Sequence, residues 1–435
     1  MKTKRKQVVI VGGGFAGIAA AKELKNSNVD VTLIDKSNHF LFQPLLYQVA
    51  TAALSPGDIA LPIRGIFGKN SNVRVLLGEV EKIFPEKKCL KLIRGRKIFY
   101  DNLILAPGAQ YNYFGNEHWK EFAPSLKTIS DALQIRERIL LSLEEAEQMK
   151  NPTLRKAHLT YVIIGGGPTG VEMAGAIAEI AGRSMRKAYK NIKEEDVRVF
   201  LVEASPQILN GFPKPLPKDG QQMLEKLGVK VLRDTPVVKI EKNKVHLKVG
   251  SIQSSNIIWA AGVKASPLLD LLNVPQDRAG RVIVNRDLSV PDFPDIFVLG
   301  DAASLEDKNG KPLPALASVA SQQGKFVGRL LTKKSFFQKS RPQFQYTNKG
   351  TMATIGRAKA VADIRGLKFS GYFAWMLWSF VHIFLLLGFR SRILVLIEWI
   401  WSYFTLKRGV QLITDRSGCS ECRPLEMEKK VKKMV

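Results

Sequence analysis

The chain has 435 residues, of which 45% are hydrophobic and 24% are charged, and it carries 34 glycines and 21 prolines. This is enough apolar material for about three domains, and it excludes the collagen-like, low-complexity and disordered classes of protein. Lysine and arginine give the chain a net charge of +27, so we expect an anionic partner, either nucleic acid or acidic lipid headgroups.

The three cysteines, Cys89, Cys419 and Cys422, are too few for a disulfide framework, so we expect the catalytic part in a reducing compartment. Cys419 and Cys422 form a C-x-x-C pair, which is half of a zinc site. No second pair or nearby histidine completes it, and no metal site is predicted. The N-terminal segment imitates a signal peptide, but glycines at the spacing of a cofactor loop interrupt its apolar run, so we expect no signal peptide.

Strand and helix patterns in the first forty residues predict one βαβ unit. It consists of a strand over 7–11, a glycine-rich turn, a helix to about residue 26 and a strand over 29–34. The pattern returns as a strand over 159–164, a helix from 169 to about 189 and a strand over 197–202. We therefore expect an α/β fold with two Rossmann-like dinucleotide-binding domains.

The first glycine-rich turn reads Gly12-x-Gly14-x-x-Gly17. Its first glycine allows a tight turn, the second lets the backbone approach a pyrophosphate, and the third lets helix and strand pack closely. The N–H groups at the start of the helix attract phosphate. Asp35 ends the second strand, where it would accept hydrogen bonds from a ribose. Together these features predict a dinucleotide site.

The second turn reads Gly165-x-Gly167-x-x-Gly170, and its strand ends in Glu203. A carboxylate at this place favours a free ribose 2′-hydroxyl and repels a 2′-phosphate. Residues 204–207 contain no arginine that would reverse this preference. The pattern predicts NADH rather than NADPH as the ligand.

Two dinucleotide folds in one chain need two dinucleotides, and a flavin with a nicotinamide is the pair between which hydride can pass. Asp301 supports the flavin, because a carboxylate that follows a strand and a tight glycine can bind ribityl hydroxyls. The alternative for Asp301 is a helix N-cap.

Strand-rich stretches follow each unit, and this order predicts that the second domain is inserted into the first. One domain is then expected over 1–115 and 280–330, and the other over 155–279. An amphipathic connecting helix is expected within 116–154.

The C-terminal region, 331–410, differs in composition from the two expected nucleotide domains and precedes a basic tail over 411–435. Its two apolar segments, 372–389 and 393–406, are separated by a basic turn. The first keeps about sixteen residues before its glycine, or roughly 24 Å of helix, which is less than the ~30 Å hydrocarbon core. From residue 331 onward the chain has 19 Lys and Arg against 6 Asp and Glu. We expect an amphipathic helical anchor that lies in one leaflet on an anionic lipid surface.

Several longer blocks carry a resemblance to a known family: NHFLFQPLLYQVATAALSPGDIALPIR, APGAQYNYFG, PSLKTISDAL, GGGPTGVEMAG, FVLGDAA and VASQQG. The chain resembles the type II NADH:quinone oxidoreductases, single-subunit NADH dehydrogenases that pump no protons. The resemblance implies a glutathione-reductase-like fold with FAD in the first site, NADH in the second and a membrane quinone as acceptor. It also implies a peripheral protein on the cytoplasmic side of the cell inner membrane.

Carried over by motif, the resemblance assigns residues to each ligand. Those expected at FAD are Gly12, Gly13, Gly14, Phe15, Ala16, Gly17, Asp35, Lys36, Gln43, Val80, Gly108 and Asp301. Those expected at NADH are Gly165, Gly167, Gly170, Glu203 and Gly262. Those expected at the quinone are Ala317, Ser318, Gln322 and Gln323. Ser318 replaces a glutamine that is common in the family, and the alternative for Gln322 and Gln323 is a solvated surface.

Glu172 lies two residues after the last glycine of the second turn. An acid in the first turn of a helix is stabilised by the helix dipole and needs no further role. The resemblance implies instead a catalytic residue near the junction of nicotinamide and flavin, where it relays protons or positions NADH.

Other functions compete with this one. A basic FAD- and NADH-binding protein could act as a redox sensor or bind nucleic acid, but no nucleic-acid motif is found, and the apolar C-terminus favours lipid. A sulfide:quinone oxidoreductase or a dithiol reductase needs cysteines beside the flavin, and Cys89 lies in a charged strand. The sequence leaves open which quinone is used, whether the substrates bind together or in turn, and whether the chain forms a homodimer.

Overall fold

The computed structural model describes residues 5–69, 71–184, 188–308, 310–332, 341–405 and 409–413. The chain folds into two compact units, and each is assembled from three segments. Unit 1 consists of Met1–Leu41, Ala60–Gln110 and Val263–Lys349. Unit 2 consists of Phe42–Ile59, Tyr111–Gly262 and Gly350–Val435.

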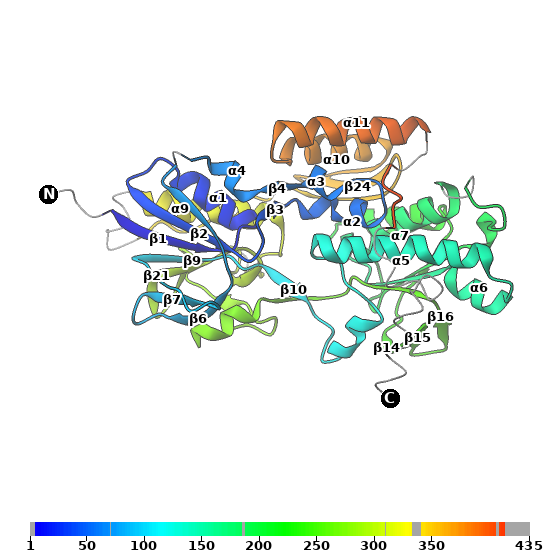
Figure 1. The fold of residues 1–435 in the computed structure, drawn as a ribbon, viewed down its shortest axis with the longest axis horizontal. Helices are drawn as coiled ribbons and strands as arrows, with labels where there is room; N and C mark the ends of the chain where they lie inside the picture. Colours follow the sequence, from blue (N-terminus) through cyan, green and yellow to red (C-terminus); the bar gives the residue numbers. More distant parts are fainter. Residues whose placement is uncertain are drawn as a thin grey trace, which may run out of the picture. The chain divides into compact units, whose positions relative to one another are not determined.

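Unit 1 is built on a six-stranded sheet with the order β20-β21-β9-β1-β2-β5 (Figure 1). Neighbouring strands run parallel except for the edge pair β20 and β21. Their bounds are β1 Lys6–Val11, β2 Val29–Asp35, β5 Val73–Leu77, β9 Asn102–Leu105, β20 Ser289–Val290 and β21 Phe293–Val298. The β-branched residues of the central strand β1 are buried, as a strand covered on both faces requires.

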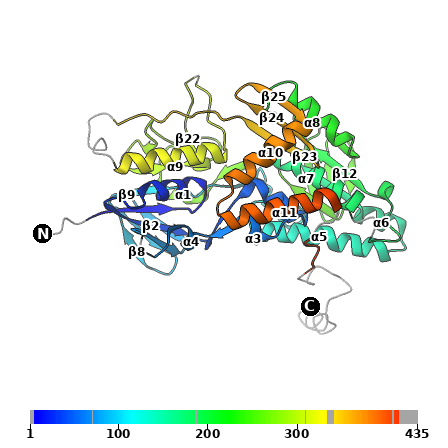
Figure 2. The same cartoon turned by 90° about the horizontal axis from the view of Figure 1, so that it is seen from above.

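Two helices lie side by side against this sheet, α1 (Phe15–Leu24) and α9 (Ala317–Thr332), as Figure 2 shows. Their contact depends on small residues, because a Cβ added at Gly324 would lie 2.1 Å from the carbonyl oxygen of Ala16. Their close packing therefore joins segments three hundred residues apart in the sequence.

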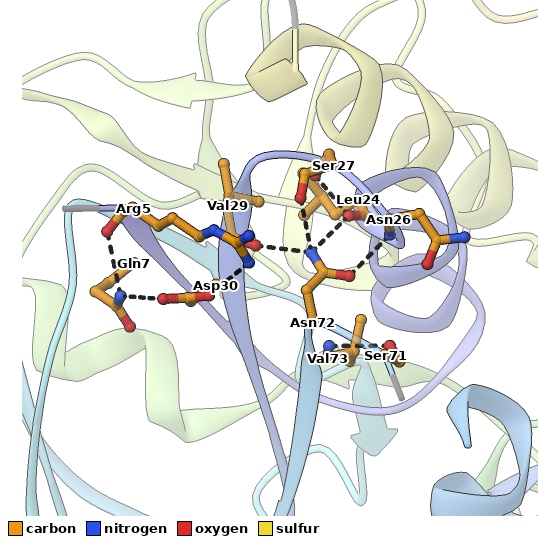
Figure 3. Close-up of polar contacts among 10 residues, drawn as sticks. All are labelled: Arg5, Gln7, Leu24, Asn26, Ser27, Val29, Asp30, Ser71, Asn72 and Val73. Atoms are coloured by element: carbon orange, nitrogen blue, oxygen red, sulfur yellow. Dashed lines mark hydrogen bonds and ion pairs between the residues drawn. The ribbon is translucent and has the colours of Figure 1, made fainter. Parts of the chain in front are cut away.

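Asn72 fixes the turn that joins α1 to β2 (Figure 3). Its Nδ2 donates hydrogen bonds to the carbonyl oxygens of Leu24 and Val29, at 3.0 and 2.7 Å. Its Oδ1 accepts from the backbone N–H of Asn26, whose φ of 65° lies in the left-handed region that asparagine tolerates. The turn of the first βαβ unit is thereby held by the residue that precedes β5.

Smaller sheets complete unit 1. They are β3 (His39–Leu41) with β4 (Ala60–Pro62), β6 (Val80–Phe84) with β7 (Cys89–Leu92) and β8 (Lys97–Phe99), β10 (Ala109–Tyr111) with β18 (Val263–Ala265), and β19 (Val282–Ile283) with β22 (Ala303–Ser304). Its short helices are α4 (Ile63–Phe67), η5 (Pro267–Leu272) and η6 (Gly300–Ala302).

Unit 2 contains a four-stranded parallel sheet with the order β13-β12-β11-β17. The strands are β11 Thr160–Ile164, β12 Arg198–Val202, β13 Val229–Leu232 and β17 Asn256–Trp259. An antiparallel sheet follows, with β14 (Val237–Glu241), β15 (Lys244–Leu247) and β16 (Ser251–Gln253). The helices of this part are η1 Gln43–Leu45, α2 Leu46–Ala50, α3 Pro56–Ile59, η2 Glu117–Glu121, α5 Ile129–Gln148, α6 Pro152–His158, α7 Pro168–Ile177, η3 Ala178–Ser184, η4 Glu194–Asp196 and α8 Leu216–Glu225.

The helix expected from 169 to about 189 is shorter in the structure. The α-helical part, α7, ends at Ile177, and η3 continues it as a π-helix to Ser184. In this π-helix the carboxylate of Glu179 accepts a hydrogen bond from the backbone N–H of Arg357, 2.5 Å away. The C-terminal part of the chain thus contacts the segment in which the helical geometry changes.

Where the structure describes it, the C-terminal region contains three antiparallel strands and two helices. These are β23 Thr351–Gly356, β24 Lys359–Ile364, β25 Leu367–Gly371, α10 Tyr372–Leu385 and α11 Phe389–Thr405. Strand β23 lies against α7 so closely that a Cβ added at Gly175 would lie 1.6 Å from the carbonyl oxygen of Ile355. Among the helices the structure describes, none combines the length and apolar character needed to cross a bilayer.

The compact units divide the chain at other points than the ranges expected from the sequence. Residues 42–59 group with unit 2, although they lie within the expected first domain, and the segment from Gly350 onward groups there too. The contacts of β23 with α7 and of β24 with α8 join the C-terminal region to unit 2, and the packing of α2 on α5 joins residues 42–59 to it.

Candidate active site

The first glycine-rich turn has the geometry of a dinucleotide loop. Gly12 has a φ of 105°, and a Cβ added there would lie 2.1 Å from the carbonyl oxygen of Ala106. A Cβ at Gly17 would lie 1.8 Å from the carbonyl oxygen of Gly12, so the first and third glycines are required for packing. A Cβ at Gly14 would meet no atom within 4 Å. The middle glycine therefore borders open space at the start of α1, where a pyrophosphate fits.

Asp35 lies beside this loop with both carboxylate oxygens in use. Its Oδ2 accepts a hydrogen bond from Gly13 N at 2.5 Å, and its Oδ1 accepts from Ser37 N at 2.6 Å. Each carboxylate oxygen has further acceptor capacity, so the group can also accept from ribose hydroxyls. Lys36 is exposed next to it, and Phe15 meets Phe40 edge-on at 5.1 Å.

The second turn repeats this construction in unit 2. Gly165 has a φ of 112°, and a Cβ at Gly170 would lie 1.8 Å from its carbonyl oxygen. Gly167 again borders space in which no atom lies within 4 Å of an added Cβ. Glu203 Oε2 accepts from Gly166 N at 2.5 Å, and Oε1 accepts from Ser205 N at 2.7 Å. The same loop and carboxylate thus occur twice, which fits two dinucleotides.

Asp301 lies in the short 3-10 helix η6, inside unit 1. The preceding Gly300 has a φ of 71°, and a Cβ there would lie 3.3 Å from Ala320 Cβ and 3.7 Å from Ala16 Cβ. The structure therefore brings Asp301 to the loop that opens α1. The alternative of a helix N-cap does not describe it, because Leu299 occupies the cap position of η6 and α9 begins only at Ala317.

Three other residues expected at FAD lie outside the glycine-rich loop. Val80 starts β6 and is buried, and Gly108 has a φ of 72° just after β9. Gln43 belongs to unit 2, where its Nε2 donates to the carbonyl oxygen of Lys127 at 3.0 Å. Their contacts with a flavin remain predictions.

The residues expected at the quinone lie on α9, in unit 1. Gln323 is only 1% exposed, and its Oε1 accepts from Gly300 N at 2.6 Å, which holds the turn that carries Asp301. Gln322 exchanges two hydrogen bonds with the backbone of Thr347, at 2.9 and 3.0 Å. Ser318 Oγ lies 3.1 Å from the hydroxyl of Tyr346. These contacts give both glutamines a structural role, and the quinone assignment, with that of Ala317, remains a prediction.

A cavity of about 320 Å³ lies within unit 2, and Glu172 is part of its wall. No pattern in the sequence predicts this cavity. It is lined by parts of α2, α7 and η3, by the β23–β24 turn and by α10 and α11, through Tyr47, Gln48, Ala53, Glu172, Ala176, Glu179, Leu227, Thr354, Gly356, Arg357, Ala358, Lys359, Trp375, Trp378, Ser379, Trp399, Ser402 and Tyr403.

Aromatic side chains dominate the side of the cavity that α10 and α11 form. The rings of Trp378 and Trp399 lie 5.3 Å apart, and those of Trp375 and Tyr403 are stacked at 5.7 Å. Two buried polar atoms of α10, Trp378 Nε1 and Ser379 Oγ, make no hydrogen bond within the described chain. Both residues line the cavity, where these atoms are able to donate to a ligand or to water.

Burial raises the pKa of the Glu172 carboxyl to about 8, and a hydrogen bond with the Thr354 backbone only partly opposes this shift. The side chain is therefore protonated at neutral pH. A helix-dipole role alone would favour the charged form and lower the pKa, so burial determines its state. The carboxyl can serve as a proton donor at the cavity.

Gly262, expected at NADH, follows β17 with a φ of 67°. A Cβ added there would lie 2.5 Å from Cζ of Phe114, a residue that no sequence motif marks as functional. Cys89 is buried in β7, whereas Cys419 and Cys422 lie outside the described residues. In the part of the chain that the structure describes, no three His, Cys, Asp or Glu residues are placed to share a metal ion.

Comparison with known proteins decides the family. Residues 6–324 match the profile of the pyridine nucleotide-disulphide oxidoreductases, and residues 348–407 match the NDH2 C-terminal domain. The type II NADH:quinone oxidoreductase Ndh of Mycobacterium tuberculosis is 41% identical over 97% of this chain and 93% of its own length. This chain belongs to the type II NADH:quinone oxidoreductases. The resemblance expected from the sequence is confirmed.

A more distant relative supports the same family, and a solved structure supports the fold. The internal alternative NAD(P)H-ubiquinone oxidoreductase A1 of Arabidopsis thaliana is 30% identical over 92% of this chain and 84% of its own length. The solved structure of NDH2 from Plasmodium falciparum in complex with NADH has a TM-score of 0.86 at 23% identity, and covers 94% of this chain and 100% of that chain. The expected α/β fold is confirmed, as are FAD and NADH as the cofactors of a type II NADH:quinone oxidoreductase.

Proposed function

We propose that this chain is a peripheral membrane flavoenzyme that oxidises NADH and reduces a membrane quinone without pumping protons. Unit 1 holds FAD through the Gly12–Gly17 loop, Asp35 and Asp301, and unit 2 holds NADH through the Gly165–Gly170 loop and Glu203. The observation that carries this assignment is the duplicated geometry, since each loop has its own carboxylate 2.5 Å from a loop N–H.

Bound FAD supplies a carrier that accepts hydride from NADH and passes two electrons to a lipid-soluble acceptor. The protein residues bind and orient the two dinucleotides and supply protons. Reduction of a quinone to a quinol takes up two electrons and two protons. Glu172, protonated at neutral pH at the cavity wall, can supply one of these protons.

The aromatic cavity of unit 2 is the place that we propose for the quinone ring. A quinone is flat and apolar and carries two carbonyl oxygens, so aromatic walls suit its faces and donors suit its edges. Trp378 Nε1 and Ser379 Oγ are buried donors in need of an acceptor. This assignment adds to the residues of α9 expected from the resemblance.

The helices that cover this cavity carry an apolar outer face. Its exposed large side chains are Tyr372, Phe373, Met376, Phe380, Phe384, Leu385, Phe389, Ile393, Leu396, Ile397, Ile400, Trp401 and Phe404. So large an exposed apolar surface is typical of a membrane or protein contact. Arg365, Lys368, Arg390 and Arg392 belong to the same region, and their charge favours anionic lipid headgroups. We propose that this face lies in the cytoplasmic leaflet of the cell inner membrane.

The test of this function is optical. Under anaerobic conditions, NADH should bleach the absorbance of the bound flavin, and a membrane quinone should then restore it. If NADH does not bleach the flavin, or if no quinone restores it, the proposed function is wrong.

The cavity assignment has a test of its own. Ser379→Trp should fill the cavity, so that flavin bleaching by NADH stays and recolouring by quinone slows at least about tenfold. Met376→Trp on the exposed face of the same helix is the matched control and should recolour at the normal rate. If Ser379→Trp does not fold, Trp378→Phe removes one donor and should raise the Michaelis constant for quinone. Normal quinone kinetics in both variants would rule out this cavity.

A further inference from the structure

Phe114 combines exposure with an unusual backbone conformation. The residue is 62% exposed, and its φ is 52°. A bulky side chain in the left-handed region is strained, and such strain is found where the surrounding structure enforces a functional geometry. A packing role does not explain it, because the neighbouring Tyr113 is only 2% exposed and already fills the core, where it stacks on Trp259 at 5.2 Å.

Two asparagines hold Phe114 in this conformation. Asn112 Oδ1 accepts from Phe114 N at 2.8 Å, and Asn116 Nδ2 donates to the carbonyl oxygen of Phe114 at 3.2 Å. Asn112 is itself fixed to the end of β17, because its carbonyl oxygen accepts from Trp259 Nε1 at 3.1 Å and its N–H donates to Gly262 O at 3.4 Å. The loop that carries Phe114 is therefore tied to the strand end that carries Gly262.

The ring lies directly against Gly262, where a Cβ would come within 2.5 Å of Cζ and 3.0 Å of Cε2. It also meets the ring of Trp259 at 6.3 Å with an angle of 62° between the planes. Glycine at position 262 leaves room for the Phe114 ring. The ring and the Gly262 backbone therefore form one continuous surface.

The order of the strands places this surface on one particular side of the dinucleotide loop. In the sheet β13-β12-β11-β17, the loop follows β11, and Glu203 directly follows the neighbour β12. Gly262 follows β17, the neighbour on the opposite side, whose next residue Ala260 lies within 2.7 Å of a Cβ added at Gly165. With its adenosine ribose at Glu203 and its pyrophosphate at the loop, a dinucleotide extends its other half toward β17.

We propose that the Phe114 ring forms a contact surface for the nicotinamide-ribose half of NADH and positions that half at the end of β17. The inference depends on the proposed NADH site in unit 2. A flat apolar ring held rigidly at a nucleotide site stacks well on a heteroaromatic base, because its position is already fixed before binding.

The test compares two ligands on the holoenzyme. NAD⁺ carries the nicotinamide-ribose half and ADP lacks it, while both carry the adenosine ribose expected at Glu203. Phe114→Ala should weaken NAD⁺ binding about fivefold or more, the range that stacking on one base supports, and should change ADP binding less than twofold. Phe114→Tyr keeps the ring and should restore NAD⁺ affinity. Phe99→Ala, at a phenylalanine 65% exposed on β8, is the matched control.

Each outcome has a defined meaning. Equal weakening of NAD⁺ and ADP by Phe114→Ala would make Phe114 a merely structural residue and overturn the inference, as would unchanged binding of both. If Glu203→Ala also leaves both ligands unaffected, the proposed NADH site itself is wrong. Should Phe114→Ala fail to fold, Phe114→Leu keeps the bulk without the aromatic face and carries the same comparison.

Discussion

At the scale of single residues, two carboxylates proposed to bind ribose hydroxyls have the same hydrogen-bond partners. Asp35 and Glu203 each bind one N–H of a glycine-rich loop and one N–H two residues further along their own strand end. This arrangement fixes the carboxylate before any ligand arrives, so ribose binding requires little rearrangement. The two sites follow one physical design in separate parts of the chain.

Replacement of Glu203 should therefore affect nucleotide choice. Glu203→Ala removes the acceptor for ribose hydroxyls. Loss of hydrogen bonds to a charged group costs about 1.5–3 kcal/mol of binding free energy, so the Michaelis constant for NADH should rise by about 10- to 150-fold. The preference for NADH over NADPH should become smaller, because the carboxylate that repels a 2′-phosphate is gone. Steady-state kinetics with both nucleotides measure this, and Glu203→Gln, which keeps the size of the side chain, should lose less. Unchanged constants for both nucleotides would contradict the assignment.

Glu172 should produce a pH dependence of quinone reduction. Its pKa is raised to about 8, so the carboxyl is protonated below that pH and loses its proton as the pH rises through it. If it donates a proton to the quinone, the rate of flavin reoxidation should fall as the pH rises through about 8. Stopped-flow measurement over pH 6–10 should show this decrease in the native chain.

The variant that tests this role is Glu172→Gln, which keeps the shape but cannot donate the proton. It should reoxidise slowly at all pH values without the decrease near 8, while FAD stays bound. Glu179→Gln, about two helical turns further along at the same cavity, should keep the pH dependence. Native rates and an unaltered pH profile in Glu172→Gln would show that the carboxyl has no part in the reaction.

At the scale of elements, α10 and α11 each have two different faces. Ala374, Trp378 and His382 recur every four residues on α10 and are buried, as is Val395 on α11. Other large apolar side chains, among them Phe380, Phe384 and Phe404, are exposed on the outer face. Trp399 also donates from Nε1 to Gln48 Oε1 at 2.8 Å, which ties α11 to α2. The helices are therefore part of the fold of unit 2 as well as an apolar surface.

Membrane binding and folding should consequently be separable by mutation. The variant Phe380→Ser, Phe384→Ser, Phe389→Ser and Phe404→Ser changes only exposed side chains and should fold. Full burial of one phenylalanine contributes about 1.5–3 kcal/mol, so the four together should lower the partition onto lipid vesicles at least a hundredfold. Vesicle flotation measures binding, and NADH oxidation with ferricyanide confirms folding. Serine at Ile93, Phe99 and Val249, exposed elsewhere, is the control, and persistent flotation of the quadruple variant would contradict the proposed anchor.

At the scale of the whole molecule, the sequence predicted the two nucleotide loops because their glycines are required by local geometry. The central strands were predicted to within about one residue, since buried parallel strands read as continuous β-branched runs. The cavity was not predicted, because α2, α7, β23, α10 and α11 build it from distant segments. Phe114 was not predicted as a functional residue, because nothing in the sequence indicates a positive φ at a phenylalanine. The packing of the C-terminal region on unit 2 was not predicted, because periodicity indicates which face of a helix is buried but not which element covers that face.

The charge of the whole chain leads to a prediction about salt. With a net charge of +27, the protein should bind anionic vesicles more tightly than neutral ones. Raising salt from about 0.1 to 1 M shortens the screening length from roughly 10 to 3 Å, so it should weaken binding to anionic vesicles and leave binding to neutral ones unchanged. Co-sedimentation at both salt concentrations tests this. Salt-insensitive binding to anionic vesicles, or no binding at all to neutral ones, would contradict a combined electrostatic and apolar attachment.

The interleaving of the two units has a consequence for synthesis on the ribosome. Four strands of the unit 1 sheet are complete by Leu105, but β20 and β21 follow only after Gly262, and α9, which covers α1, ends at Thr332. At a synthesis rate of about 5–20 residues per second, α9 is completed roughly 15 to 60 seconds after α1, and the small-residue face of α1 stays uncovered during this time. The four-stranded sheet of unit 2, by contrast, lies within 160–259 and is translated without interruption. The half of the protein whose synthesis begins first is therefore completed later. A nascent chain from which residues 1–270 have left the ribosome should contain a complete unit 2 sheet and an incomplete unit 1 sheet.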